Sequence, residues 1–282
     1  MNTKVQKKKK KLKKNIKTYQ KYRYLLVELI RKNIKLKYRN SWLGMFWTFL
    51  QPLLNMIVLS MVFTNIFGKS SDGVYCYPIY LLSGRLIFEF FTQSTKKALR
   101  SFRENASIVK KVYVPKYMYP ISGVLSNFVT FGISIGVLLV MTVLFKVTDI
   151  ADGANIQLTY RVIGIVIPLA ILLILSTGFG LILSTLAVYF RDIEYIYDVF
   201  STLLFYMMPV VYHISKITNV FVSTLIKINP LYGITEMLRE CVLYGRDISW
   251  NYLLYSLSCS LVILAIGIFV FEKKSDDFVL HI

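Results

Sequence analysis

Four long stretches without a charged residue constrain this chain more than any other feature. They cover Met45–Phe67, Tyr119–Phe145, Val162–Phe190 and Tyr252–Phe271. A helix needs roughly 20 apolar residues to cross the hydrocarbon core of a bilayer, so each stretch is long enough. Hydrophobic residues make up 55% of the 282, above the range that is usual for soluble domains. The pattern predicts an all-α polytopic membrane protein.

Two weaker apolar segments complete the predicted set of spans. Residues 77–95 are interrupted by Arg85 and Glu89, and residues 195–212 are short and begin beside acidic side chains. We therefore predict six transmembrane helices, at about 45–67, 77–95, 118–145, 162–190, 195–212 and 252–271.

The segment before the first span has the periodicity of an amphipathic helix. Tyr22, Leu26, Ile30, Ile34 and Tyr38 recur every four residues, and lysine and arginine gather on another face. Such a helix lies in the membrane interface with its apolar stripe among the acyl chains. We predict an interfacial helix over residues 22–40.

Positive charge is concentrated on one side of the predicted membrane. Of the 34 lysines and arginines, sixteen lie in residues 1–39 and seven in 96–116, whereas the loops 68–76 and 146–161 hold one and two. Positive charge near span ends stays cytoplasmic. Both termini are therefore predicted to be cytoplasmic, with 1–21 as a basic tail and 272–282 as a C-terminal tail. This distribution favours membrane lipids, and not nucleic acid, as the partner of the net charge of +19.

The region between the last two predicted spans, residues 219–246, is interrupted. An apolar piece, Val220–Ile228, stops at Asn229-Pro230, where a second helix can begin. Broken helices at membrane depth are tolerated where they are buried in protein or line a cavity. We expect re-entrant half-helices that enter from the outer face, with an ordinary extracellular loop as the alternative.

Small residues at four-residue steps predict close helix packing in two spans. Gly132 and Gly136 form a GxxxG pair, and Ser176, Gly180 and Ser184 form a second stripe. Small side chains at this spacing let helices approach closely in lipid.

The sequence offers no candidate catalytic centre. Gly68-Lys69-Ser70 is preceded five residues earlier by Phe63, so it does not form a phosphate-binding loop. The two histidines and three cysteines have no metal-ligand spacing. A polytopic glycosyl- or acyltransferase would need a histidine or paired acids at a membrane face. A proton- or sodium-coupled transporter would need more ionisable residues at mid-membrane. We expect neither an enzyme nor a bound cofactor.

Five motifs in order carry a resemblance to a known family. They read KYRNSWLGMFWTFLQPLL, YLLSG, ENASIVKKVYVPKYMYP, YFRDIEYI and INPLYGITEMLRE. The set resembles the ABC-2 type permeases that export polysaccharides, a group that includes O-antigen, capsule and teichoic acid exporters. The similarity covers nearly the whole chain after about residue 20, with residues 22–271 as the transmembrane domain. An ABC-2 exporter of a drug or small lipid is the nearest alternative.

The resemblance implies a transport subunit without its own ATPase motif. It implies a homodimer in the bacterial cytoplasmic membrane, bound to two copies of a separate ATPase subunit that holds ATP and magnesium. The substrate would be a lipid-linked polysaccharide.

The same resemblance places a coupling helix in the cytoplasmic loop 98–116. Glu104 suits a helix N-terminus, and Pro115 would end the helix, because the residue before a proline disfavours helical geometry. The interfacial helix is also expected to touch the ATPase. The predicted ATPase-coupling residues are Glu104, Asn105, Ile108, Val109, Lys110, Lys111, Val112 and Tyr113.

A channel between the two subunits is the last implied feature. Arg85 and Glu89 can pair along one helix, and intramembrane charges usually face protein or water. Arg85 either contacts an anionic group of the substrate or belongs to an ion pair that only fixes packing. Aromatic rings could stack on sugars or pack between helices. The channel candidates are Arg85, Glu89, Phe88, Phe91, Phe205 and Tyr206.

Overall fold

The computed structural model describes residues 22–39, 41–67, 76–109, 114–149, 151–275 and 278. Side chains at 63–67 and 216 are outside this description. The predicted basic tail 1–21, most of the predicted C-terminal tail, and the coupling residues Lys110, Lys111, Val112 and Tyr113 lie outside the described residues.

Every regular element in the described part of the chain is a helix. A first helix over residues 22–38 is followed by η1 (Gly44–Phe46), α2 (Trp47–Phe67), α3 (Tyr77–Glu104), α4 (Ala106–Val109), α5 (Met118–Thr148), η2 (Gly153–Asn155), η3 (Tyr160–Ile165), α6 (Val166–Tyr189), α7 (Ile193–Tyr206), η4 (Ile214–Lys216), α8 (Val220–Ile228), α9 (Pro230–Val242) and α10 (Trp250–Lys274).

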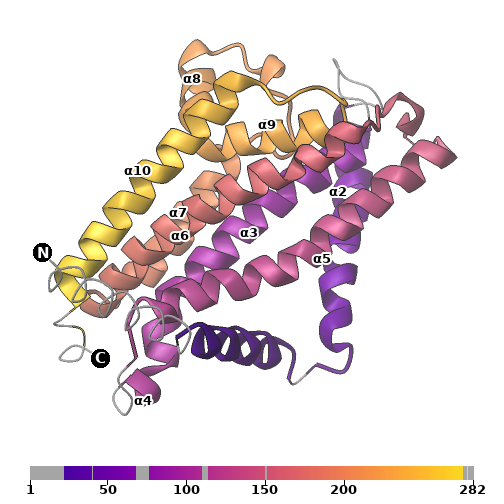
Figure 1. Cartoon of the computed structure of the whole chain (residues 1–282). Coiled ribbons are helices and arrows are strands. Elements are labelled where there is room, and N and C mark those ends of the chain that lie inside the picture. Colours follow the sequence, from indigo (N-terminus) through magenta and orange to yellow (C-terminus); the bar gives the residue numbers. More distant parts are fainter. Residues whose placement is uncertain are drawn as a thin grey trace, which may run out of the picture.

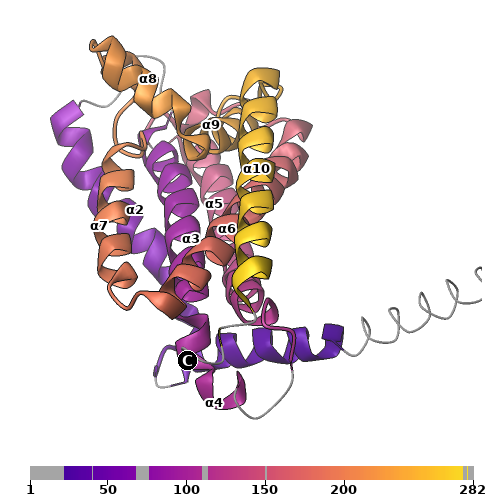
Figure 2. The ribbon, with the colours of Figure 1, turned by 90° about the vertical axis from the view of Figure 1, so that its left-hand side faces the viewer.

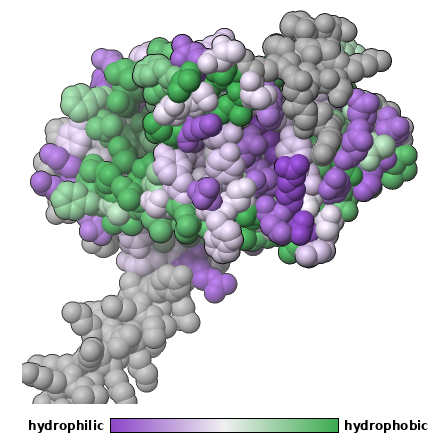
Figure 3. All heavy atoms as spheres, turned by 90° about the horizontal axis from the view of Figure 1, so that it is seen from above, coloured by the Kyte–Doolittle hydropathy of each residue, from purple (hydrophilic) through white to green (hydrophobic). Residues whose placement is uncertain are grey.

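The long helices run side by side, and the short ones gather at the two ends. α3, α5, α6 and α10 form the body of the bundle (Figure 1). The first helix lies across one end beside α4, and α8 and α9 sit at the opposite end (Figure 2). The face at the α8–α9 end carries a broad hydrophobic area on one side and mostly hydrophilic residues on the other (Figure 3). The two ends are therefore built from different elements.

Four of the described helical segments are long and apolar enough to cross a membrane. They are Gly44–Val62, Met118–Thr148, Tyr160–Tyr189 and Trp250–Lys274. The chain is accordingly a multi-pass membrane protein. The other two predicted spans are less simple, because α3 carries Arg85 and Glu89 and α7 has only 14 residues.

α3 forms the centre of the bundle. It contacts α2, α5, α6, α7 and α9, and Leu81, Leu82 and Ile87 are almost completely buried. It also runs from Tyr77 to Glu104, well beyond the predicted span end at residue 95. One continuous helix therefore connects the two ends of the molecule.

The apolar side of the first helix is only partly available to lipid, contrary to the expectation that its stripe lies among the acyl chains. Leu29 is only 6% exposed and packs in a cluster with Phe102, Tyr119 and Phe271. The helix is amphipathic, as predicted, but part of its stripe is covered by protein, because the ends of α3, α5 and α10 meet at this point. Tyr24, at 70% exposed, remains on the outside.

Close helix packing occurs at one predicted stripe and not at the other. A Cβ on Gly180 would lie 2.9 Å from the Cβ of Ala98, which confirms close packing of α6 on α3. A Cβ added to Gly132 or Gly136 would have no described atom outside the local helix within 4 Å. α6 and α10 also approach closely, where a Cβ on Gly178 would lie 2.7 Å from the backbone N of Leu264.

This difference predicts opposite outcomes for one substitution at two glycines. Gly178→Leu should lower the melting temperature of the purified protein by at least about 5 °C, because overpacking of this kind costs about 1–3 kcal/mol or more. Gly136→Leu makes the same chemical change at an open site and should stay within about 2 °C of wild type. Equal losses in both variants, measured by thermal unfolding in detergent, would contradict the packing described here.

Candidate functional site

The predicted coupling segment begins differently from the expectation. Glu104 does not start a helix; it is the last residue of α3, and its carboxylate accepts a bond from Lys97 Nζ at 2.5 Å. The reason is that the polar continuation of α3 stays helical through residues that pair along it and with α7. The helix that follows, α4, lies in the predicted coupling loop and has four residues, Ala106–Val109.

Asn105 positions α4 against the rest of the protein. It is 5% exposed. Its side-chain Nδ2 donates to the carbonyl of Ser101 at 2.8 Å, and its Oδ1 accepts from Lys32 Nζ at 2.8 Å. Its carbonyl accepts from the backbone N–H groups of Ile108 and Val109. Asn105 thus links the end of α3, the first helix and α4.

The apolar residues of α4 are half-buried. Val109 packs against the cluster that contains Phe102 and Tyr119. Ser107 is exposed, and Ile108 is half-buried. α4 therefore presents a small surface while it remains attached to the bundle.

A polar ladder joins the same end of α3 to α7. Lys96 Nζ lies 2.5 Å from Asp198 Oδ1. Arg100 Nε donates to Glu194 Oε1 at 2.5 Å, and Arg103 donates to the other oxygen of Glu194. These charge-assisted bonds are the strong class of hydrogen bond, and they hold the start of α7 to the segment that leads into α4.

A buried tyrosine extends this ladder inward. Tyr197 is 3% exposed. Its hydroxyl bonds to the hydroxyl of Thr95 and donates to the carbonyl of Thr92 at 3.3 Å. A displacement of α3 at this end must therefore be shared by α7.

The environment of Glu194 makes this contact depend on pH in a definite direction. Hydrogen bonds from Arg103 and Arg100, and their positive charges, hold the pKa of Glu194 below its ordinary value, against a smaller opposing effect of dehydration. A carboxylate with a lowered pKa stabilises the folded state above its unfolded pKa, and loses that effect as the pH falls through its folded pKa. The ladder should be intact from neutral pH down to about pH 5.

At the opposite end of the bundle, the backbone that follows α7 is irregular, and side chains of α3 and α9 donate hydrogen bonds to its carbonyl groups. Tyr77 donates to the carbonyl of Val211 at 2.6 Å, and Tyr80 donates to that of Tyr212 at 3.0 Å. Arg239 donates to the carbonyl of Pro209 at 2.9 Å. Non-helical backbone at membrane depth requires such partners, because lipid offers none.

Arg239 is the centre of this cluster. It is completely buried in α9. Its Nη1 lies 2.8 Å from Glu236, its Nη2 also donates to the carbonyl of Tyr80 at 3.3 Å, and its guanidinium lies 3.4 Å from the centre of the Tyr80 ring. A Cβ on Gly84 would lie 2.8 Å from Nη2, so glycine leaves the space for this arginine. A buried charge is tolerated only when it is paired and hydrogen-bonded, as it is here.

The predicted pair of short helices is present. α8 ends at Ile228 and α9 begins at Pro230. Between them Asn229 caps α9, since its Oδ1 accepts from the backbone N of Leu231 at 3.0 Å. Their entry into the membrane remains a prediction.

The channel candidates divide into two groups. Arg85 Nε lies 2.8 Å from Glu89 Oε1, as the spacing predicted, and Asn55 Nδ2 of α2 donates to the same oxygen at 3.3 Å. The Arg85 guanidinium also lies 5.6 Å from the centre of the Phe205 ring of α7. This group joins α2, α3 and α7, and Arg85 keeps 29% of its side chain exposed.

The aromatic candidates lie in different environments. Phe91 is 2% exposed and packs edge-on against Phe179 of α6. Phe88 is 9% exposed and packs edge-on against Phe205, whereas Tyr206 is 69% exposed. Packing within the subunit explains the positions of Phe88 and Phe91, whereas the ring of Tyr206 is exposed outside the core. A channel role for any of the six candidates remains a prediction.

Sequence reasoning missed the two clusters that fix the ends of α3. Lys96, Arg100 and Arg103 recur at steps of four and three residues, and the acids Glu194 and Asp198 recur at a step of four. These matching helical spacings could have indicated the ladder. No comparable signal marked Arg239, because its partners come from three separate segments. Among the described residues, no three His, Cys, Asp or Glu side chains form a potential metal site.

Comparisons with known proteins now decide the family. The family model described as "ABC-2 type transporter" matches residues 24–243. The chain belongs to the ABC-2 type transporter family. It is 26% identical over 258 residues to an O-antigen export system permease protein of Myxococcus xanthus, across 91% of this chain and 95% of the relative.

Two further relatives belong to the same class of exporter. An O-antigen export system permease protein of Klebsiella pneumoniae is 27% identical over 254 residues, across 90% of this chain and 93% of the relative. A polysialic acid transport protein of Escherichia coli is 22% identical over 256 residues, across 88% and 92%. The resemblance that the motifs indicated is thereby confirmed.

The ladder makes a prediction about this ABC-2 protein that a pH series can test. Glu194→Gln should lower the melting temperature at pH 7 by about 2–4 °C, the effect of about 1 kcal/mol, because two arginines lose their carboxylate. The difference from wild type should persist to about pH 5 and shrink below about pH 4, since an ordinary glutamate protonates near 4.3.

Asp192→Asn is the matched control, because Asp192 is an exposed acid two residues away. It should leave the melting temperature unchanged. The ladder would be refuted by an unchanged Glu194→Gln melting temperature at pH 7, or by an equal loss in the control.

Proposed function

We propose that this chain is the permease subunit of an ATP-driven exporter that moves a lipid-linked polysaccharide across the bacterial cytoplasmic membrane. The O-antigen, capsule and teichoic acid types of polymer are the candidate substrates. The observation that carries the proposal is the ABC-2 family match over residues 24–243. The chain also aligns over nearly the full length of O-antigen export permeases and of a polysialic acid transport protein.

In this proposal a separate ATPase subunit supplies the energy. The sequence has no phosphate-binding loop of its own, and ATP and magnesium would be held by two copies of the partner. α4 and the first helix would contact that partner at the cytoplasmic face. Asn105 supports this assignment, because its side chain is hydrogen-bonded both to Lys32 of the first helix and to the end of α3. A force applied at α4 would therefore be transmitted directly to α3.

The proposed topology has six crossings with both termini in the cytoplasm. α3 would be the second crossing, because its 28 residues exceed the roughly 20 that a bilayer requires. α7 would be the fifth crossing. Its 14 helical residues are too few to span the bilayer, and the irregular backbone at 207–212, which accepts hydrogen bonds from Tyr77 and Tyr80, would cover the remaining distance. α8 and α9 would then form the re-entrant outer gate.

A homodimer would place the polymer path between two copies of the chain. Apolar residues on α2 and α7 support this arrangement, because Met61, Val199 and Leu203 are 67%, 63% and 59% exposed in the single chain. Tyr206 belongs to α7 and packs against Phe205, and the Arg85 guanidinium of α3 contacts the ring of the same Phe205. Both side chains therefore lie near the exposed residues of α7. Closure of the ATPase subunits would push α4, and the ladder would carry the movement to α7.

The docking role of α4 predicts loss of the partner without loss of the fold. Ser107→Glu with Ile108→Glu should reduce ATPase recovered with tagged permease at least tenfold, because two charges enter a small docking surface. Permease yield and melting temperature should stay near wild type. The control, Val147→Glu with Thr148→Glu, places two charges at exposed positions of the far end of α5. Undiminished recovery of the ATPase with the α4 variant would contradict the docking role.

The Arg85–Glu89 pair predicts a selective loss of transport. Arg85→Gln with Glu89→Gln should reduce export of an anionic polymer at least tenfold in reconstituted vesicles, with a melting temperature within about 2 °C of wild type. The control neutralises the outer pair Arg161–Asp247, whose atoms lie 2.8 Å apart. Unchanged export, or a drop in melting temperature that matches the loss of export, would leave the pair with a packing role only.

A further inference from the structure

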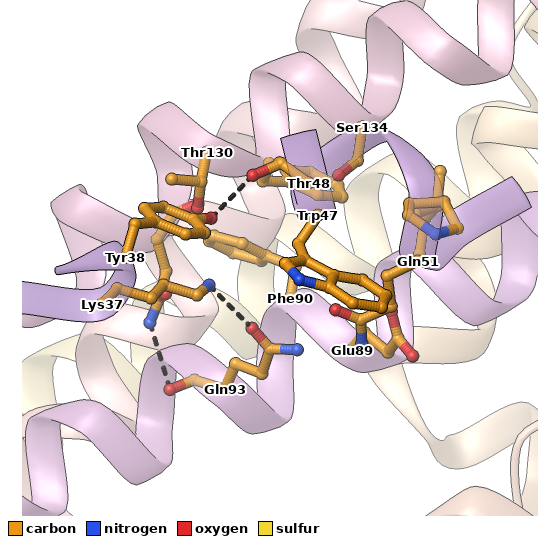
Figure 4. Close-up of a pocket in the computed structure, with 14 residues that line it drawn as sticks. Lys37, Tyr38, Trp47, Thr48, Gln51, Glu89, Phe90, Gln93, Thr130 and Ser134 are labelled. Atoms are coloured by element: carbon orange, nitrogen blue, oxygen red, sulfur yellow. Dashed lines mark hydrogen bonds between the residues drawn. The ribbon is translucent and has the colours of Figure 1, made fainter. Parts of the chain in front are cut away.

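A groove opens at the side of the bundle between the first helix, α3 and α5. Its volume is about 590 Å³, within the range of small-molecule sites. It continues into a smaller pocket of about 70 Å³, where Lys37, Gln93 and Thr130 lie near Trp47 and Glu89 (Figure 4). Glu104 of the predicted coupling segment lines the groove and Glu89 of the channel candidates lines the smaller pocket, whereas the other described residues of these two sets line neither.

Four positively charged side chains line the groove, against one acid. The cations are Lys37, Lys96, Lys97 and Arg100, and the acid is Glu104. Lys96 and Arg100 are directed to the acids of α7, and Lys97 pairs with Glu104. The groove thus has a positive excess, although three of its cations already have partners.

Lys37 differs from the other three. Its Nζ donates to the neutral amide oxygen of Gln93 at 3.3 Å, and no carboxylate lies within 4.0 Å of it in the part of the chain that the structure describes. The side chain remains open to the groove. Dehydration by the walls lowers the pKa of Lys37, opposed by the nearby charge of Glu89 and assisted by that of Lys97. An anion at this position would relieve the cost of that dehydration.

The surroundings of the groove fit the boundary between lipid and water. The first helix lies across the end of the bundle (Figure 2). Leu36, which lines the groove, is 49% exposed, and Val129, which lies between the lining residues Asn127 and Thr130 in the sequence, is 53% exposed. Asn33 and Asn127 supply amide groups along the wall. An anionic group could thus occupy the groove while attached acyl chains follow the exposed apolar flank.

We propose that this groove binds the phosphate headgroup of an anionic glycerophospholipid of the adjacent membrane leaflet, with Lys37 as the principal contact. Basic pockets between helices at a membrane face are suited to lipid phosphates. The volume of about 590 Å³ is sufficient for a lipid headgroup. The lipid would hold the first helix against α3 and α5, and so hold the face that carries α4. This inference does not require the exported substrate to be a polysaccharide.

Binding of phosphatidylglycerol to the full chain tests the proposal. The protein in neutral detergent is titrated with phosphatidylglycerol or phosphatidylcholine, and lipid-bound species are counted by native mass spectrometry. Wild type should bind one phosphatidylglycerol preferentially, and Lys37→Gln should weaken this binding about fivefold, the effect of one cation near a membrane surface. Lys37→Arg should restore it.

Lys35→Gln is the matched control, because Lys35 is an exposed lysine on the same helix that does not line the groove. It should bind phosphatidylglycerol as wild type does. Equal binding by Lys37→Gln and wild type, or an equal loss in Lys35→Gln, would overturn the site. A polyprenyl diphosphate that displaces phosphatidylglycerol and binds at least tenfold more tightly would overturn the assigned occupant.

Discussion

The fully buried guanidinium of Arg239 is the interaction on which the α8–α9 end of the structure depends. A membrane interior cannot accept unpaired backbone groups, so in the proposed topology the irregular chain after α7 must find partners within the protein. Arg239, Tyr77 and Tyr80 supply them at Pro209, Val211 and Tyr212. The same guanidinium is neutralised by Glu236 and covers the ring of Tyr80. One side chain of α9 therefore fixes both α3 and the end of α7.

α3 extends this constraint to the other end of the protein. The helix is continuous from Tyr77 to Glu104, and its last turns carry the cations that pair with Glu194 and Asp198. α7 is thus attached to α3 at both of its ends, by charges at one and by donated hydrogen bonds at the other. In the proposed exporter, this arrangement makes α3 the rigid connection between the ATPase-docking surface and the outer half-helices.

The sequence predicted the apolar helices well, because bilayer thickness fixes the length of an uncharged helical stretch. It also located the break at Asn229-Pro230, where the chemistry of capping and of proline is local. It did not indicate that α3 continues to Glu104, since the apolar signal stops near residue 95 and the remaining turns are stabilised by acids about a hundred residues away. Glu104 was assigned to the wrong helix end for the same reason.

Tertiary packing explains the remaining differences from the sequence analysis. The sequence predicted that the apolar stripe of the first helix faces lipid, and only the meeting of α3, α5 and α10 reveals why Leu29 on this helix is buried. Gly132 and Gly136 have a packing motif that the described part of this chain does not use, whereas Gly178 packs closely without such a motif. Arg239 stood within a recognised motif, but its role depends on carbonyls that no spacing rule brings together.

A distance measurement within one subunit tests most directly whether α3 connects the two ends rigidly. Spin labels would be placed at position 107 in α4 and at position 246 just after α9, in the reconstituted complex with its ATPase. The account predicts the same distance distribution without nucleotide and with a non-hydrolysable ATP analogue. A shift of about 5 Å or more between the two states would contradict it.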